Sequence, residues 1–138
     1  MKPTDKTAPD QGDTVALEIE LSHSPKKVWR ALTDPVLLSE WLLPTFGLQL
    51  ERGAAFTLKT QAFPGWDGTV SCRFVEIEEG RKLSYTWSVP GMDTVVTFTL
   101  TPTATGTQLS LVQSGFAATQ KREFGGARYG WQMMLERL

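Results

Sequence analysis

The alternation of apolar and polar residues predicts β-strands through most of the chain. From Thr14 to Ser22 every second residue is apolar, which is typical of a strand with one buried face. The same period returns after Gly47, where turn residues divide the sequence into six predicted antiparallel strands. Within residues 70–77 the apolar phase slips after Phe74, and this slip predicts a β-bulge.

The apolar positions of these later strands fall on one face and form the predicted core, because successive side chains of a strand point to opposite faces. They are Phe56, Leu58, Val70, Cys72, Phe74, Leu83, Tyr85, Trp87, Val96, Phe98, Leu100, Leu109 and Leu111.

Two short helices are predicted between the first strand and the others. Ser24-Pro25 and Asp34-Pro35 are both helix-start signals, because the Ser or Asp side chain can cap free amides and proline suits the first helical position. An apolar stripe follows each signal, and Pro44 ends the second helix.

A long amphipathic helix is predicted from about residue 119 to the C-terminus, because apolar residues there recur with helical spacing. Gly125, Gly126 and Gly130 fall in this segment, although each costs about 1 kcal/mol relative to alanine in a helix. Two explanations remain open. Either the helix backbone approaches the sheet closely at these glycines, or the helix starts after Gly126.

The order of these elements predicts an α+β domain with seven strands over residues 14–138. Its curved antiparallel sheet would wrap around the C-terminal helix. A helix inside a curved sheet leaves a gap, which suits a ligand cavity. Residues 1–13 are rich in Pro, Gly and charged residues and contain no large apolar residue except Met1, so we expect a disordered tail.

The overall composition excludes several classes of function. The chain has 138 residues, 14 Lys and Arg against 15 Asp and Glu, and a net charge of −1, which argues against nucleic acid as a partner. One Cys and one His cannot provide a disulfide or a structural zinc site, and we expect no cofactor. No signal peptide or membrane span is evident, which predicts a soluble cytoplasmic protein.

Several short motifs together resemble the SRPBCC (START-like, helix-grip) superfamily. Within it, they are most similar to the group named after the activator of the ninety-kilodalton heat-shock chaperone ATPase. The resemblance covers residues 14–138. Its motifs are Ala31-Leu32-Thr33-Asp34-Pro35, Trp41, Gly68-Thr69-Val70, Leu83-Ser84-Tyr85-Thr86-Trp87, Ser114-Gly115-Phe116 and Gly130-Trp131.

This resemblance implies a helix-grip fold, in which a seven-stranded sheet holds the C-terminal helix over a hydrophobic cavity. Members of the superfamily include lipid-transfer domains, polyketide cyclases and aromatases, and plant hormone receptors. The fold alone therefore does not identify the ligand.

We predict that aromatic and apolar side chains from the converging faces line this cavity, with Gln113 and Arg128 as polar groups that orient a ligand. The full set of predicted ligand-binding residues is Trp41, Phe46, Phe56, Leu58, Cys72, Phe74, Tyr85, Trp87, Phe98, Gln113, Arg128, Trp131, Met134 and Leu135.

No catalytic group in the sequence has an evident partner. His23 is the one histidine, and Cys72 lies on an apolar strand face where burial would keep the thiol protonated. The leading hypothesis is therefore binding of a small hydrophobic or aromatic molecule. Two alternatives are a cofactor that modulates a chaperone ATPase, with the chaperone as partner, and an enzyme of cyclase or aromatase type.

Overall fold

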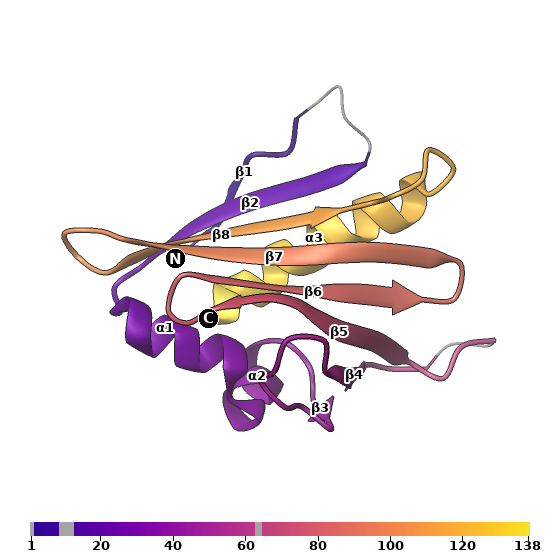
Figure 1. Cartoon of the computed structure of the whole chain (residues 1–138). Coiled ribbons are helices and arrows are strands. Elements are labelled where there is room, and N and C mark those ends of the chain that lie inside the picture. Colours follow the sequence, from indigo (N-terminus) through magenta and orange to yellow (C-terminus); the bar gives the residue numbers. More distant parts are fainter. Residues whose placement is uncertain (1, 9–12, 63–64) are drawn as a thin grey trace.

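The computed structural model describes residues 2–8, 13–62 and 65–138. An antiparallel sheet covers one side of three helices (Figure 1). The elements in chain order are β1 (Thr4–Asp5), β2 (Thr14–Leu21), α1 (Pro25–Thr33), α2 (Pro35–Trp41), β3 (Thr45–Phe46), β4 (Ala55–Lys59), β5 (Thr69–Glu78), β6 (Lys82–Val89), β7 (Met92–Pro102), β8 (Thr107–Ser114) and α3 (Lys121–Arg137).

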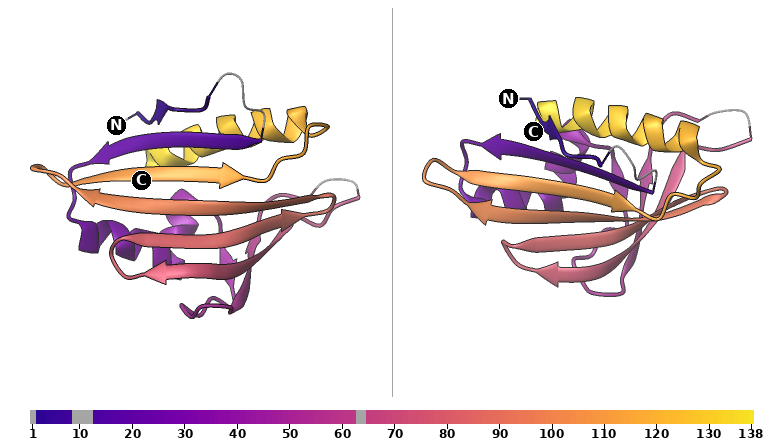
Figure 2. Two further views of the ribbon diagram at one scale, coloured as in Figure 1. Left: turned by 45° about the horizontal axis from the view of Figure 1, so that its top comes forward. Right: turned by 90° about the horizontal axis from the view of Figure 1, so that it is seen from above.

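The described strands form an eight-stranded sheet in the order β1-β2-β8-β7-β6-β5-β4-β3. All neighbouring strands are antiparallel, and β2 pairs with β8, so the first long strand of the chain lies beside the last one. The sheet curves around α3 (Figure 2). This arrangement confirms the predicted α+β, helix-grip architecture.

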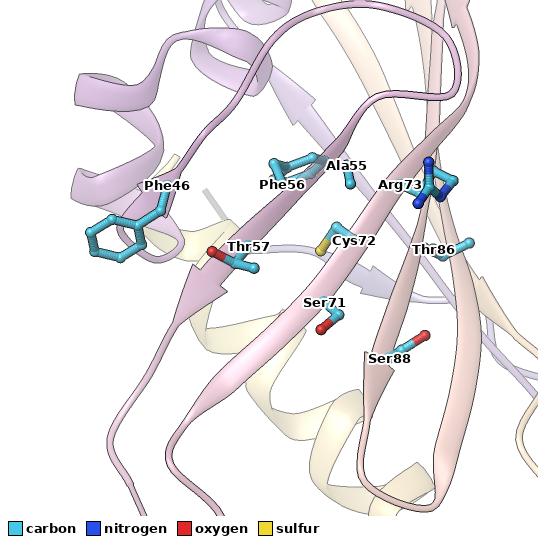
Figure 3. A pocket seen from close by; sticks show the side chains of 9 residues that line it. All are labelled: Phe46, Ala55, Phe56, Thr57, Ser71, Cys72, Arg73, Thr86 and Ser88. Carbon is cyan, nitrogen blue, oxygen red and sulfur yellow. The ribbon is translucent and has the colours of Figure 1, made fainter.

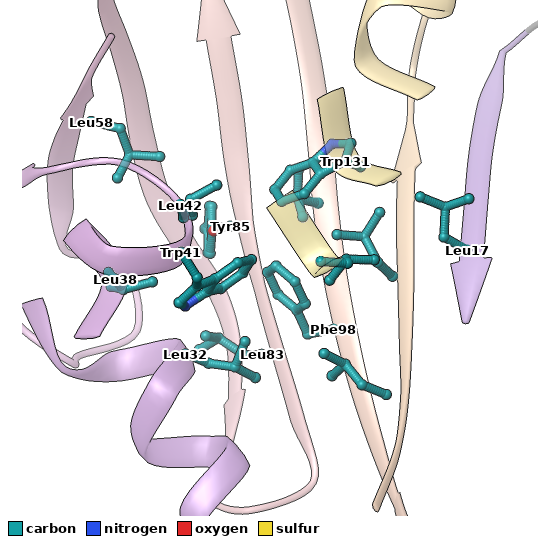
Figure 4. Close-up of a cluster of buried hydrophobic side chains, with 14 of the residues drawn as sticks. Leu17, Leu32, Leu38, Trp41, Leu42, Leu58, Leu83, Tyr85, Phe98 and Trp131 are labelled. Carbon is teal, nitrogen blue, oxygen red and sulfur yellow. The ribbon is translucent and has the colours of Figure 1, made fainter. Parts of the chain in front are cut away.

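The predicted helix starts are correct at both short helices. The Ser24 hydroxyl accepts a hydrogen bond from the Lys27 N–H at 3.3 Å, and the Asp34 carboxylate accepts one from the Val36 N–H at 2.9 Å. A proline occupies the start of each helix, as expected. The two helices place Leu32, Leu38 and Trp41 against the inner face of the sheet (Figure 4).

The inner face of the sheet carries the predicted apolar phase. In β7, for example, Val96, Phe98 and Leu100 are buried, whereas Thr99 is exposed. The pairing of β5 with β6 shifts register between Phe74 and Glu76, which confirms the predicted bulge. The two long hairpins and β2 therefore present one continuous apolar surface to the helices.

The sheet has one strand more than the seven predicted. Among the described residues five strands, rather than six, follow Gly47, and the two-residue strands β1 and β3 lie at the sheet edges. Strand β1 belongs to the segment expected to be disordered. It pairs with β2, and Asp5 accepts hydrogen bonds from Arg128 and Gln132 of α3. Residues 1 and 9–12 of that predicted tail lie outside the described residues.

Helix α3 runs through its three glycines, so the alternative in which it starts after Gly126 is wrong. Close approach to the sheet does not explain them either. A Cβ atom at Gly125 or Gly126 would meet no atom within 4 Å, and one at Gly130 would meet only the Met134 methyl group, at 3.9 Å. The glycines therefore border open space. No helix among the described residues is long and apolar enough to span a membrane.

Candidate functional site

A cavity of about 490 Å³ lies between the first half of α3 and the end of the sheet that carries the β6–β7 turn. Most of its wall is apolar. The lining residues are Leu43, Thr60, Trp66, Val70, Trp87, Val89, Met92, Gln113, Glu123, Gly126, Ala127, Gly130, Trp131 and Met134. Its mouth lies beside the first turns of α3, because Glu123 and Gly126 are exposed to solvent.

The sequence of α3 explains why the helix leaves space here. Residues 123, 126, 127, 130 and 134 follow the i, i+3, i+4, i+7 spacing of one helical face. Gly126, Ala127 and Gly130 on this face have little or no side chain, so they do not reach the sheet. One helical turn after Trp131, the Leu135 side chain is completely buried and packs between the helix and the sheet. The cavity thus occupies the part of the interface where α3 carries small residues.

Three indole rings form part of the cavity wall. Trp87 of β6 and Trp131 of α3 have ring centroids 5.3 Å apart with their planes inclined by 59°. Trp66, which precedes β5, donates its indole N–H to the Thr69 carbonyl oxygen at 3.0 Å. Aromatic rings at such positions offer large flat apolar surfaces to a ligand.

A chain of buried hydrogen bonds runs from the Trp131 ring to the backbone of Trp87. The Trp131 indole N–H donates to Gln113 Oε1 at 2.8 Å, and Gln113 Nε2 donates to Thr94 Oγ1 at 2.9 Å. The Thr94 hydroxyl in turn donates to the Trp87 carbonyl oxygen at 2.8 Å. Gln113 is only 1% exposed. These bonds link α3 to three neighbouring strands and fix the orientation of the Gln113 amide.

Comparison with known proteins places this fold in a family. A family model described as "Activator of Hsp90 ATPase homolog 1-like protein" matches residues 22–138. The chain belongs to this family. The match confirms the resemblance inferred from the sequence motifs. The comparison with curated proteins gives no match.

Solved structures agree with membership of the activator-like family. Protein MLL2253 from Mesorhizobium loti has 41% sequence identity and a TM-score of 0.83, covering 90% of this chain and 92% of its own. Protein CV1439 from Chromobacterium violaceum has 29% identity and a TM-score of 0.76, over 92% and 94% of the two chains. CalU16 from Micromonospora echinospora, with 23% identity and a TM-score of 0.76 over 98% and 80%, shares the fold.

Within this activator-like domain the predicted site residues separate into distinct places. Trp87, Gln113, Trp131 and Met134 line the cavity. The others fill the core or lie elsewhere. Buried in the core are Trp41, Phe56, Leu58, Cys72, Phe74, Tyr85, Phe98 and Leu135.

Contacts between aromatic rings fill the core around Phe98 (Figure 4). The Phe98 ring lies 6.2 Å from Trp41, 6.1 Å from Tyr85 and 5.9 Å from Trp131, measured between ring centroids. Phe98 is buried among these rings and does not line the cavity. The predicted convergence of aromatic residues is therefore present, but most of these residues are packing partners in the core.

Phe46 and Arg128 do not face the cavity. Phe46 is 57% exposed, because β3 lies at the sheet edge and the ring projects beside a shallow depression of about 300 Å³ on the outer face (Figure 3). Arg128 is exposed and donates to the Asp5 carboxylate on the side of α3 near β1. Gln113 does line the cavity, but both ends of its amide bind protein atoms, so it holds the Trp131 ring.

Sequence reasoning missed the lining residues that come from loops. It also missed those on the glycine face of α3, the helix face that carries Gly126 and Gly130. Trp66 lies in a turn-rich stretch without periodicity, and Glu123, Gly126 and Gly130 lie on a helix whose orientation the sequence does not reveal. The signal that could have found Gly126 and Gly130 was their spacing of four residues, which places both on the same face of the helix.

Cys72 is a buried free thiol, and its burial agrees with the prediction. Burial raises the pKa of Cys72 to about 12, so the nucleophilic thiolate is scarce at neutral pH. Burial also raises the pKa of the nearby Tyr85 hydroxyl well above its usual 10. Neither group is prepared for acid–base work near pH 7.

Proposed function

We propose that this protein binds a small planar apolar molecule in the cavity between α3 and the sheet. The observation that carries the proposal is the cavity itself, which has about 490 Å³ of space, a largely apolar wall and a mouth beside α3. This volume is in the range of small-molecule sites. Membership of the activator-like family supports the fold, and the wall chemistry supports the choice of ligand.

The rigid indole walls favour a planar ring over a flexible chain. The Gln113 amide holds the Trp131 ring by a hydrogen bond, and the Trp87 ring packs against it with centroids 5.3 Å apart, so both are ordered before a ligand enters. Preorganised walls reduce the entropy lost on binding. A planar bicyclic ring can pack flat between such surfaces and the bare backbone of Gly126 and Gly130.

Titration calorimetry and thermal unfolding with a matched panel of ligands test this proposal. The panel contains ethylnaphthalene as a planar apolar probe and decane as a flexible one. We expect ethylnaphthalene to bind with a Kd on the order of 10–100 µM, and to raise the melting temperature. Decane is expected to bind more weakly. Absence of binding and of any thermal shift with ethylnaphthalene would overturn the proposal.

A further inference from the structure

Glu123 gives the cavity mouth a negative charge. It is the one charged side chain among the described residues that line the cavity, and it is exposed in the first turn of α3. A carboxylate near a helix N-terminus stabilises the helix, so Glu123 also has a structural role. The neighbouring Lys121 and Arg122 are exposed and do not line the cavity wall.

The N–H groups on the cavity wall already serve the protein. The indole N–H groups of Trp66 and Trp131 and the Gln113 amide donate to protein oxygens at 3.0, 2.8 and 2.9 Å. The second amide hydrogen of Gln113 and the Thr60 hydroxyl are neutral groups. A ligand carboxylate would therefore lose its water without gaining a cationic partner on the described wall, which is costly.

Two other basic residues close to the cavity in sequence are paired elsewhere. Arg128 of α3 forms its ion pair with Asp5 of β1. Lys59, which directly precedes the cavity-lining Thr60, lies 3.7 Å from the Asp67 carboxylate and donates to Thr69. Neither contributes to the cavity wall.

The indole walls favour a cation for a separate reason. The face of an aromatic ring carries negative electrostatic potential, and tryptophan attracts cations more strongly than tyrosine or phenylalanine does. Trp66, Trp87 and Trp131 all line the cavity that Glu123 borders. The rings and the carboxylate thus attract the same type of ligand.

From these observations we infer that the cavity selects an aromatic amine, with its ring against the indole walls and its ammonium group toward Glu123, and excludes aromatic carboxylates. This inference rests on the proposed function, since it names the class of ligand for the same cavity.

Three ligands that share one ring test the inference by titration calorimetry at pH 7. They are naphthylmethylamine, which is protonated at this pH, neutral ethylnaphthalene, and naphthylacetic acid, which is ionised. We expect the amine to bind about fivefold more tightly than ethylnaphthalene, and the acid at least about tenfold more weakly. At about 0.5 M NaCl the advantage of the amine is expected to shrink, because salt screens exposed charges.

Two charge-removing variants locate the effect. In Glu123→Gln the advantage of the amine over ethylnaphthalene should fall below about twofold, whereas Glu136→Gln should preserve it, because Glu136 lies near the other end of α3 and outside the cavity.

The outcomes separate the inference from the proposed function. If ethylnaphthalene binds but the acid binds as tightly as the amine, the inference is wrong and the proposed function stands. The inference is also wrong if Glu123→Gln leaves the amine preference intact. If none of the three ligands binds, both the inference and the proposed function fail.

Discussion

Replacing Gly126 by leucine is expected to block the cavity while making the protein more stable. The space for the new side chain is present, because a Cβ at Gly126 would meet no atom within 4 Å and Gly126 lines the cavity. Gly125 provides a matched control. It has the same open surroundings and lies in the same helix, but it does not line the cavity.

The magnitude follows from two contributions. Leucine in place of glycine inside a helix gains about 0.8 kcal/mol in either variant. At Gly126 the side chain also covers apolar wall, and since full burial of leucine is worth about 1.5–3 kcal/mol, partial burial at the mouth adds about 1 kcal/mol. We therefore expect stabilisation of about 2 kcal/mol for Gly126→Leu and about 0.8 kcal/mol for Gly125→Leu.

Urea and thermal unfolding measure the change in stability of each variant, and titration calorimetry with ethylnaphthalene measures the change in ligand affinity. The melting temperature should rise by roughly 3–5 °C for each kcal/mol gained. Gly126→Leu should weaken ligand binding at least about tenfold, whereas Gly125→Leu should leave it unchanged. If both variants bind the ligand equally well, the cavity is not the binding site. If Gly126→Leu is no more stable than Gly125→Leu, its side chain does not enter the cavity.

Three further predictions concern the surroundings of the cavity. Gln113→Leu should destabilise the protein by about 2–3 kcal/mol in urea unfolding, because it leaves the buried Trp131 N–H without an acceptor; a loss below about 0.5 kcal/mol would contradict this. Partial burial raises the pKa of Asp5, but hydrogen bonds from Thr7 and the Arg128 guanidinium lower it by more than burial raises it. The pKa of Asp5 therefore lies below the usual 3.8. Asp5→Asn should therefore cost up to about 1 kcal/mol above pH 5, and this cost should disappear as the pH falls through the lowered pKa; an effect independent of pH would refute the ion-pair explanation. Cys72 should resist alkylation by iodoacetamide at pH 8 in the folded protein and react after unfolding, and rapid labelling of the folded state would contradict its burial.

The glycine face of α3 lowers the stability of the helix and leaves room for the cavity. Gly126 and Gly130 together cost the helix about 2 kcal/mol relative to alanine. No backbone atom of the sheet lies close enough to require glycine at either position. The open space beside them is the physical feature that alanine or a larger residue would reduce.

The regular elements could be predicted from the sequence because they repeat a period. Alternation identified the buried faces of the long strands, and even the bulge after Phe74 was visible as a slip in that alternation. The caps at Ser24 and Asp34 were visible because capping depends on local residue types. These features are determined over a few neighbouring residues.

The short strands and the cavity could not be predicted in the same way. Strands β1 and β3 have two residues each, too few to show a period. Phe46 and Arg128 face away from the cavity because of their places at a sheet edge and on the β1 side of α3. The division of aromatic residues between the Phe98 core and the cavity depends on how far α3 stands from the sheet, which is a property of the assembled fold.

Nuclear magnetic resonance of the indole N–H groups tests the central proposal most directly. The chain has five tryptophans, and Trp66, Trp87 and Trp131 line the cavity, whereas Trp29 is buried in α1. Titration with ethylnaphthalene is expected to shift the three cavity signals, assigned through single Trp→Phe variants, and to leave the Trp29 signal in place. No shift in the three cavity signals, or a shift confined to Trp29, would contradict binding in this cavity.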